Sequence, residues 1–466
     1  MQISDSPLSE AFINALRQIF DERQLRLDEA ERWTYGYDNS RQHRLPGVVV
    51  IPDSGTQVAA LLRLCNEYCV PVVARGSGTG TAGAAIPSVH GVVLSTENLN
   101  QILKVDPDNR LMIVQPGVTN QQVQQAAEEY GFFWPPDPTS AAVCTLGGNI
   151  ACNAAGPRAV KYGTPRENVL GLQAVTATGK PFTTGTHTTK GVVGYDLTRL
   201  LIGSEGTLAV ITEATLKLTP TPECKRTLRA LYKDMESAAR AVSRLMAQPV
   251  TPCALEFMDG QALAMIRNYA ETNLPVDAGA LLMIEVDGPQ SCINDATNAV
   301  AKAAKGKGCL EVLQAKSKEE VTALWTLRKA LSPALRKVAP KKINEDVVVP
   351  VSRIPELITG LQQLSKKHNI TIVNFGHAGN GNIHVNLLVN PDDYGEMQRA
   401  EICLGELFEL VLTLEGTLSG EHGIGLVKRD FVPLEIDPVS LKLMLQIKQQ
   451  FDPNNILNPG KKIPTV

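Results

Sequence analysis

The sequence predicts an α+β fold of two or three domains, on three observations. The chain has 466 residues, more than one compact core normally holds. Its opening reads as a strand, a helix and a second strand, followed by further short strand patterns. Its later part alternates strand and helix patterns without the regular repeat of a doubly wound sheet, which is typical of an α+β arrangement.

Residues 1–222 are expected to form the first domain, and hydrophobic periodicity places its elements. Helical patterns cover residues 8–30, 54–68 and 119–130. Strand patterns cover residues 48–51, 70–74, 92–95, 102–105, 111–115, 169–176 and 208–219. Between residues 135 and 171 the chain is rich in proline, glycine and alanine. We therefore expect little regular helix there, and a ligand that satisfies the irregular backbone.

Residues 223–430 are expected to form a second domain, because the run Thr-Pro-Thr-Pro at 219–222 reads as a hinge. Strand patterns at 227–231, 280–286, 371–375 and 384–389 alternate with helical patterns at 235–246, 295–304, 355–368 and 395–414. This alternation predicts an α+β domain with a mostly antiparallel sheet. Residues 431–466, with a helix at 441–451, are expected to fold back and pack on the first domain.

The composition of the chain argues against several classes of function. A net charge of −3 gives no electrostatic reason to bind nucleic acid. The nine cysteines form no C-x-x-C pair, which indicates buried thiols in a reducing cytosol rather than an iron–sulfur cluster. No basic region followed by an apolar run marks a secretory signal, and no apolar stretch reaches membrane-spanning length. We expect a cytoplasmic protein, with any contact to the inner membrane peripheral.

A glycine loop follows the strand at 70–74. Gly78, Gly80 and Gly83 satisfy the G-x-G-x-x-G pattern, but a dinucleotide-binding fingerprint needs a helix that opens at the third glycine. Pro87 and a turn at 88–91 come too soon for that helix, so we reject the NAD interpretation. The glycines instead predict a nest of backbone N–H groups for a pyrophosphate; the alternative is a flexible loop.

Two polar segments predict the chemical site. G-H-A-G-N-G-N-I-H-V-N carries His377 and His384, and G-E-H-G-I-G carries Glu421 and His422. A spacing of seven places two side chains on opposite faces of one strand, but a turn at 378–382 would bring both rings together. Imidazole and carboxylate together suit zinc, or a similar divalent ion such as manganese. The alternative is a set of hydrogen-bonded turn histidines.

Several motifs resemble the FAD-linked oxidase family, which has the vanillyl-alcohol oxidase fold. These are V-V-A-R-G-S-G-T-G, P-D-P-T-S, G-G-N-I-A-C-N-A-A-G-P and G-Y-D-L-T-R-L-L-I-G-S-E-G-T-L-A-V-I-T. The resemblance implies an FAD-binding domain of that type, followed by a substrate (cap) domain. Some relatives attach FAD through a histidine in the first loop, and this loop has none, so noncovalent FAD is expected. The implied FAD contacts are Arg75, Gly76, Ser77, Gly78, Thr79, Gly80, Pro138, Thr139, Ser140, Gly147, Gly148, Asn153, Gly156, Gly206, Thr207 and Ile211.

The second half resembles D-lactate, glycolate and D-2-hydroxyglutarate dehydrogenases. The resemblance implies metal ligation by His377, His384 and Glu421, and Arg328 as the substrate-carboxylate ligand. His422 is the candidate general base, with a ligand or orienting role as its alternative. Further candidate substrate contacts are Ser332, one helical turn after Arg328, Lys342, for a second carboxylate, and Asn386.

The expected activity is FAD-dependent oxidation of a D-2-hydroxy acid to the 2-oxo acid, with D-lactate favoured and D-2-hydroxyglutarate and glycolate as alternative substrates. Without the resemblance, Arg328 and Lys342 would read as solvated surface charges. The expected electron acceptor is a quinone, a cytochrome, an electron-transfer flavoprotein or an iron–sulfur subunit, and a homodimer is a further expectation. The alternative of another class is a noncatalytic FAD-binding subunit that passes electrons.

Overall fold

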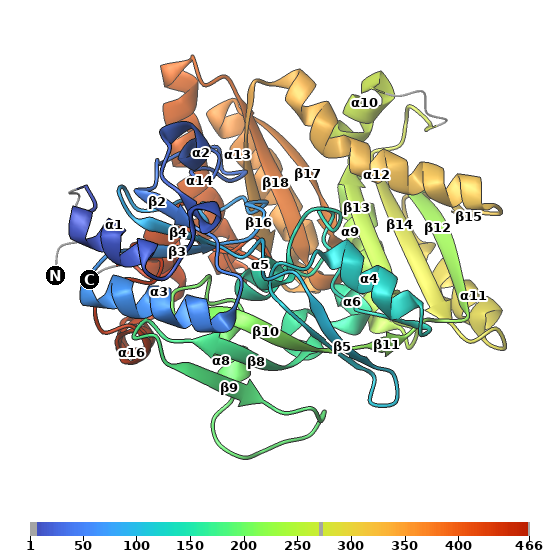
Figure 1. Cartoon of the computed structure of the whole chain (residues 1–466). Helices are drawn as coiled ribbons and strands as arrows, with labels where there is room; N and C mark the ends of the chain where they lie inside the picture. Colours follow the sequence, from blue (N-terminus) through green and yellow to red (C-terminus); the bar gives the residue numbers. More distant parts are fainter. Residues whose placement is uncertain (1–6, 270–273, 465–466) are drawn as a thin grey trace. The chain divides into compact units, whose positions relative to one another are not determined.

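The computed structural model describes residues 7–269 and 274–464 (Figure 1). Contacts divide the chain into two compact units. The first unit takes the chain up to Ala155, then Gly163–Thr221 and the stretch from Glu421 onward. The second unit takes Gly156–Tyr162 and Pro222–Gly420. The three-part domain division expected from the sequence stays a prediction.

The first unit contains a small, mostly parallel sheet in the order β1-β2-β4-β3. Its strands are β1 (Leu25–Arg26), β2 (Val48–Val50), β3 (Val72–Arg75) and β4 (Val92–Ser95), and β4 runs parallel to both β2 and β3. Helix α3 (Gly55–Glu67) connects β2 to β3 and buries an apolar stripe that includes Val58, Leu61 and Leu62. The C-terminal segment, residues 431–466, contacts this sheet: the Val72 N–H donates to the carbonyl of Ile456.

A second sheet of the first unit is antiparallel, in the order β5-β6-β10-β8-β9. Its strands are β5 (Ile102–Asp106), β6 (Leu111–Val114), β8 (Val169–Val175), β9 (Pro181–Gly185) and β10 (Val210–Lys217). A two-stranded pair joins β7 (Phe132–Phe133) to β11 (Thr219–Pro220). The helices here are α1 (Glu10–Arg17), α2 (Glu29–Trp33), α4 (Asn120–Glu128), α5 (Leu146–Cys152), α7 (Pro165–Asn168), α8 (Leu197–Leu201), α15 (Val432–Glu435) and α16 (Pro438–Phe451).

The second unit is built on a seven-stranded antiparallel sheet in the order β15-β12-β14-β13-β17-β18-β16 (Figure 1). Its strands are β12 (Cys224–Tyr232), β13 (Ala254–Asp259), β14 (Ala280–Gly288), β15 (Cys309–Gln314), β16 (Lys341–Val348), β17 (Thr371–His377) and β18 (Asn382–Val389). Its helices are α6 (Ala159–Tyr162), α9 (Met235–Ala247), α10 (Gly260–Tyr269), α11 (Ile293–Ala304), α12 (Lys318–Val338), α13 (Ile354–His368) and α14 (Tyr394–Thr413). The predicted antiparallel sheet is thus confirmed.

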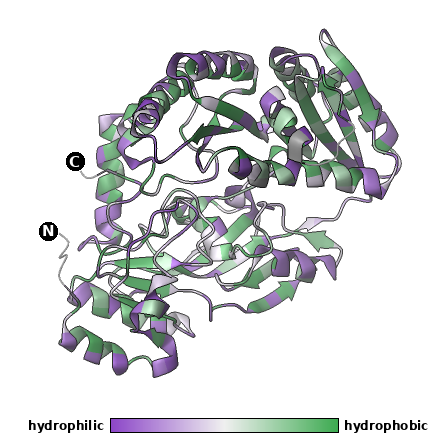
Figure 2. Ribbon diagram, turned by 90° about the horizontal axis from the view of Figure 1, so that it is seen from above, coloured by the Kyte–Doolittle hydropathy of each residue, from purple (hydrophilic) through white to green (hydrophobic). Residues whose placement is uncertain are grey.

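Alternation along these strands gives the sheet two buried faces. Met283 and Phe375 lie on one face, in a core with residues of α10 and α12 such as Leu331. Intervening residues such as Leu282 and Ile284 point to the other face, where α9, α11, α13 and α14 contact the strands. Green and purple residues alternate around the helices in Figure 2, as expected of helices with one buried side.

Two expectations were wrong in detail. Residues 8–30 do not form one helix, because Asp21 caps a separate turn, η1 (Glu22–Gln24), and Leu25 then pairs with Val50. Residues 135–171 contain three short helices, α5 to α7, although little helix was expected. Gly147 lies in the first turn of α5, where a Cβ would come within 2.6 Å of Pro116, so glycine serves close packing of a helix there rather than an irregular backbone.

No helix in the part of the chain that the structure describes is long and apolar enough to cross a bilayer.

Candidate active site

The two candidate metal-ligating histidines lie on a β-hairpin. His377 ends β17, and the η3 turn (Ala378–Asn380) leads to β18, which carries His384. Gly381 completes the turn with φ +74°, and a Cβ there would lie 1.9 Å from the Val349 carbonyl oxygen, so the turn requires glycine. Phe375 pairs with His384 across the strands, which places His377 and His384 on the same face. Their ring centroids are 5.1 Å apart.

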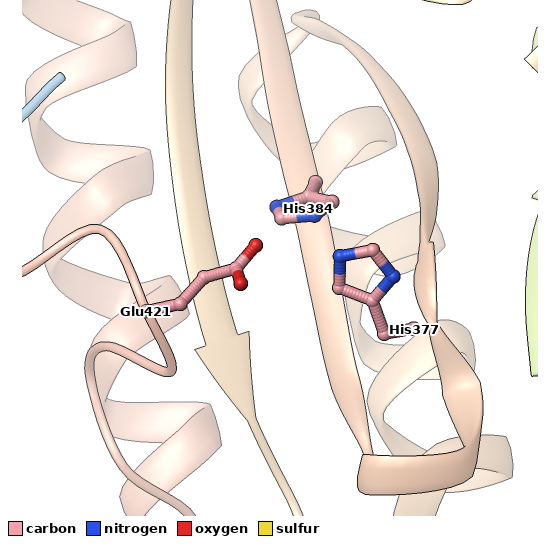
Figure 3. Close-up of side chains that lie close together, drawn as sticks. All are labelled: His377, His384 and Glu421. Carbon is pink, nitrogen blue, oxygen red and sulfur yellow. The ribbon is translucent and has the colours of Figure 1, made fainter. Parts of the chain in front are cut away.

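Glu421 completes a group that could hold a metal ion. The ligand atoms of His377, His384 and Glu421 all lie within 4.8 Å of one another, and the carboxylate points toward the rings in Figure 3. The second unit fixes the backbone just before Glu421, since the Gly420 N–H donates to the Asp346 carboxylate at 2.9 Å. Both histidines are buried and Glu421 is half-buried. Two imidazoles and one carboxylate fit a divalent ion with open positions for substrate.

Helix α12 brings the candidate substrate cation to the same sheet. Arg328 Nε donates to Glu256 Oε2 at 2.7 Å, and the guanidinium lies 4.8 Å from the centroid of the Phe375 ring. Phe375 is the cross-strand partner of His384. The arginine side chain is only 11% exposed. Arg328 is therefore a buried, fixed cation beside the histidine hairpin and not a solvated surface charge.

Two further candidate substrate residues contact each other. Lys342 Nζ donates to Ser332 Oγ at 2.9 Å, which joins β16 to α12. Asn386 is fully buried, and its amide bonds to Asn344 and to the carbonyl oxygens of Val373 and His384. The structure thus brings Ser332 and Lys342 together on the α12 side of the sheet, and it engages the Asn386 amide within the sheet itself.

Glu256 is a residue of this site that the sequence analysis missed. It is 1% exposed on β13, and its two oxygens accept hydrogen bonds from His377 Nδ1 (2.5 Å) and Arg328 Nε (2.7 Å). Burial alone would raise the pKa of this carboxyl, but the nearby His377 and Arg328 outweigh it, so the pKa is lowered. The available signal was one carboxylate inside the apolar run at 253–258.

The loop that carries His422 is held within the first unit by Glu205. The N–H groups of Ile424 and Gly425 donate to the two oxygens of Glu205, at 2.9 and 2.8 Å. Glu205 is 4% exposed. Gly423 and Gly425 have φ of +83° and +51°, in the left-handed region that glycine adopts without steric cost. His422 itself is half-buried.

The glycine loop after β3, which is the predicted phosphate cradle, is closely packed at Gly76 and Gly78. A Cβ on Gly76 would lie 2.0 Å from Thr145 Oγ1, a buried hydroxyl with no hydrogen-bond partner among the described residues. Such an orphaned hydroxyl fits a bound group that supplies its partner. The Arg75 guanidinium folds beneath the loop, where it donates to the Tyr37 carbonyl, and a Cβ on Gly78 would collide with it.

The remaining candidate cofactor contacts of the sequence analysis lie on turns and helix ends. Ser77, Thr79 and Gly80 continue the glycine loop, Gly148 lies in α5, and Asn153 caps its end with φ +55°. Pro138, Thr139 and Ser140 precede α5, Gly156 precedes α6, Gly206 and Thr207 precede β10, and Ile211 lies in β10. Their contacts with FAD stay predictions.

Comparison with known proteins defines the class. Residues 46–185 match the FAD binding domain family, and residues 221–462 match the C-terminal domain of FAD linked oxidases. The chain is similar to p-cresol methylhydroxylase (TM-score 0.79, 17% identity, 98% of each chain) and to alkyldihydroxyacetonephosphate synthase (TM-score 0.74, 21% identity, 98% of this chain and 88% of that one). The protein is therefore an FAD-linked oxidoreductase.

Curated relatives cover almost the whole chain. The glycolate oxidase subunit GlcD of Bacillus subtilis is 40% identical over 433 residues, which are 93% of this chain and 92% of the relative. A D-lactate dehydrogenase of Archaeoglobus fulgidus is 39% identical over 422 residues, 89% of this chain and 91% of the relative. The chain belongs to the FAD-linked oxidase family, with the vanillyl-alcohol oxidase type of fold, as the motifs predicted. The cradle around Gly76 and Thr145 fits FAD, and His377, His384 and Glu421 fit a divalent ion.

Proposed function

We propose that this protein oxidises a D-2-hydroxy acid, with D-lactate favoured, to the 2-oxo acid, assisted by a divalent metal ion. The grouping of His377, His384 and Glu421 beside the buried cation Arg328 carries the proposal. The names of the relatives, D-lactate dehydrogenase and glycolate oxidase subunit, support the substrate class. Electrons leave to a non-NAD acceptor: a quinone, a cytochrome, an electron-transfer flavoprotein or an iron–sulfur subunit.

Binding of the substrate is assigned to Arg328. A guanidinium pairs with a carboxylate through two parallel hydrogen bonds, which fixes the orientation of the acid. The contact with Phe375 and the bond to Glu256 hold the guanidinium in place beforehand. A carboxylate held in this way turns the α-carbon and its hydroxyl toward the histidine hairpin.

Removal of the proton from the substrate hydroxyl is assigned to His422, because imidazole is a base near neutral pH. Glu205 accepts hydrogen bonds from backbone N–H groups of the loop that carries His422. The backbone to which the His422 imidazole is attached is therefore held in place. His377, His384 and Glu421 would hold a divalent ion, zinc or manganese, which would supply electrostatic stabilisation of the deprotonated hydroxyl. The cradle around Gly76 and Thr145 would hold FAD noncovalently, and FAD would supply the hydride acceptor.

Lys342 favours D-2-hydroxyglutarate as a second candidate substrate. The Lys342 ammonium donates a hydrogen bond to Ser332 Oγ, on the same helix as Arg328, and could bind the distal carboxylate of that diacid. Glycolate is the third candidate, from the name of the Bacillus subtilis relative. A noncatalytic electron-transfer subunit is the remaining alternative, and it offers no reason for two buried histidines to face one carboxylate.

A substrate panel tests the proposal. The purified flavoprotein is assayed with D-lactate, L-lactate, glycolate and D-2-hydroxyglutarate and an artificial dye acceptor, before and after treatment with a chelator. We expect the highest kcat/KM with D-lactate, and loss of activity on chelation that added zinc or manganese restores. Absence of turnover with every acid would refute the enzymatic proposal, and turnover indifferent to chelation would refute the metal.

A further inference from the structure

Glu256 joins two parts of the candidate site that come from distant stretches of sequence. Its Oε1 accepts from His377 Nδ1 on β17, and its Oε2 accepts from Arg328 Nε on α12. The partners stand 121 and 72 residues away along the chain. All three residues belong to the second unit. One buried carboxylate therefore sets the position of a candidate metal ligand and of the candidate substrate cation at the same time.

The bond to His377 fixes which ring nitrogen can bind a metal ion. An ionised carboxylate only accepts hydrogen bonds, so His377 Nδ1 must carry a proton. In the neutral ring the lone pair is then on Nε2, and that nitrogen is the one able to ligate. Carboxylates that accept from a ligating imidazole orient the ring and raise its basicity in this way.

The hydrogen bond between Glu256 and Arg328 determines which edge of the guanidinium is available to a substrate carboxylate. Glu256 takes the Nε hydrogen, so the donors on the two terminal nitrogens form the edge suited to a bidentate substrate carboxylate. The Phe375 ring under the guanidinium restricts its plane. Rotation of Arg328 would break the Glu256 bond, so the cation cannot be re-aimed without disturbing the carboxylate that also holds His377.

We infer that Glu256 is a positioning residue that couples the metal ligand His377 to the substrate-binding Arg328. The inference rests on the proposed function and deepens it, because it predicts that metal affinity and substrate affinity fall together when one carboxylate is altered. A merely structural carboxylate in the same sheet would not connect the two.

The neighbouring strand offers a matched control. Glu285 on β14 is 3% exposed, and its carboxylate accepts from Thr227 Oγ1 and from Trp325 Nε1, both at 2.9 Å. It is thus a buried glutamate in the same sheet that also contacts α12. It pairs in addition with Lys225 at 3.0 Å, and its partners among the described residues include neither of the two histidines nor Arg328. Glu285→Gln therefore measures the effect of disturbing a buried carboxylate in this sheet without touching the coupling.

The experiment uses the FAD-loaded full chain, stripped of metal and titrated with zinc ions in a calorimeter. The wild type, Glu256→Gln, Glu256→Asp and Glu285→Gln are compared, and kcat and KM for D-lactate are then measured on the zinc-loaded samples. A glutamine cannot accept from both partners, and an aspartate is one methylene too short to reach both. We expect both Glu256 variants to bind zinc about 10- to 100-fold more weakly and to have a raised KM, while Glu285→Gln keeps the wild-type zinc affinity.

Each result decides between the claims. Zinc affinity and KM of the Glu256 variants equal to the wild type would overturn the coupling alone, while the proposed function stands. Equal weakening by Glu285→Gln would reduce Glu256 to a structural role. A wild type that binds no zinc would overturn both the metal part of the proposed function and the coupling. Should Glu256→Gln fail to fold, Glu256→Asp, which keeps the charge, carries the same comparison.

Discussion

Replacing Arg328 with lysine tests how the candidate substrate cation works. Arg328 uses Nε for Glu256 at 2.7 Å, and its terminal nitrogens are assigned to the substrate carboxylate. A lysine keeps the positive charge but has a single ammonium. That group cannot donate to Glu256 and at the same time form two parallel hydrogen bonds to a substrate carboxylate. The variant therefore loses at least one charge-assisted hydrogen bond, while the charge itself stays.

The size of the effect follows from that count. One hydrogen bond to a charged group contributes about 1.5–3 kcal/mol, which corresponds to a roughly 10- to 150-fold lower kcat/KM. We expect most of the loss in KM, because a carboxylate clamp binds the ground state and the transition state alike.

The assay is steady-state oxidation of D-lactate with a dye acceptor, with flavin content measured on each sample. Lys329→Gln is the control, since Lys329 lies next on α12 but is exposed. A wild-type kcat/KM for Arg328→Lys would refute the assignment of Arg328 to the substrate carboxylate.

Three other predictions address the base, the cradle and pH. His422→Ala should keep its flavin and lose about 10²- to 10⁴-fold in kcat; equal loss of flavin and turnover would indicate a structural role. Gly76→Ala should lower the flavin-to-protein ratio, because its Cβ would lie 2.0 Å from Thr145 Oγ1, while Gly405→Ala, with no described atom within 4 Å, should not; an unchanged ratio in Gly76→Ala would contradict the cradle. Burial raises the pKa of Asp259 to about 6, so the folded chain holds this proton more tightly and stability falls as pH rises through that range. The free energy of unfolding of Asp259→Asn, measured by urea titration, should then rise relative to that of the wild type from acid to neutral pH. A difference between the two free energies that does not change with pH would contradict the prediction.

Much of the fold could be predicted because its signals are local. The helix after β2 shows an apolar stripe with Val58 and Leu61, and the glycines at 376, 379 and 381 mark a turn between the two histidines. That turn was enough to expect both rings on one side, and the hairpin places them 5.1 Å apart.

The connections between distant strands could not be predicted in this way. Glu256 meets His377 only because β13 pairs with β17, and no local pattern fixes which strands become neighbours in an antiparallel sheet. The anchoring of the His422 loop by Glu205 joins residues 219 apart, so it was equally hidden. Residues 8–30 show the reverse case, where pairing of Leu25 with Val50 overrides a local helical pattern.

Reduction of the bound flavin by D-lactate under anaerobic conditions tests the central claim most directly. The account predicts that D-lactate bleaches the visible flavin absorbance of the purified protein, that chelation abolishes the bleaching, and that zinc or manganese restores it. Flavin that stays oxidised in the presence of D-lactate, glycolate and D-2-hydroxyglutarate, with metal supplied, would contradict the account.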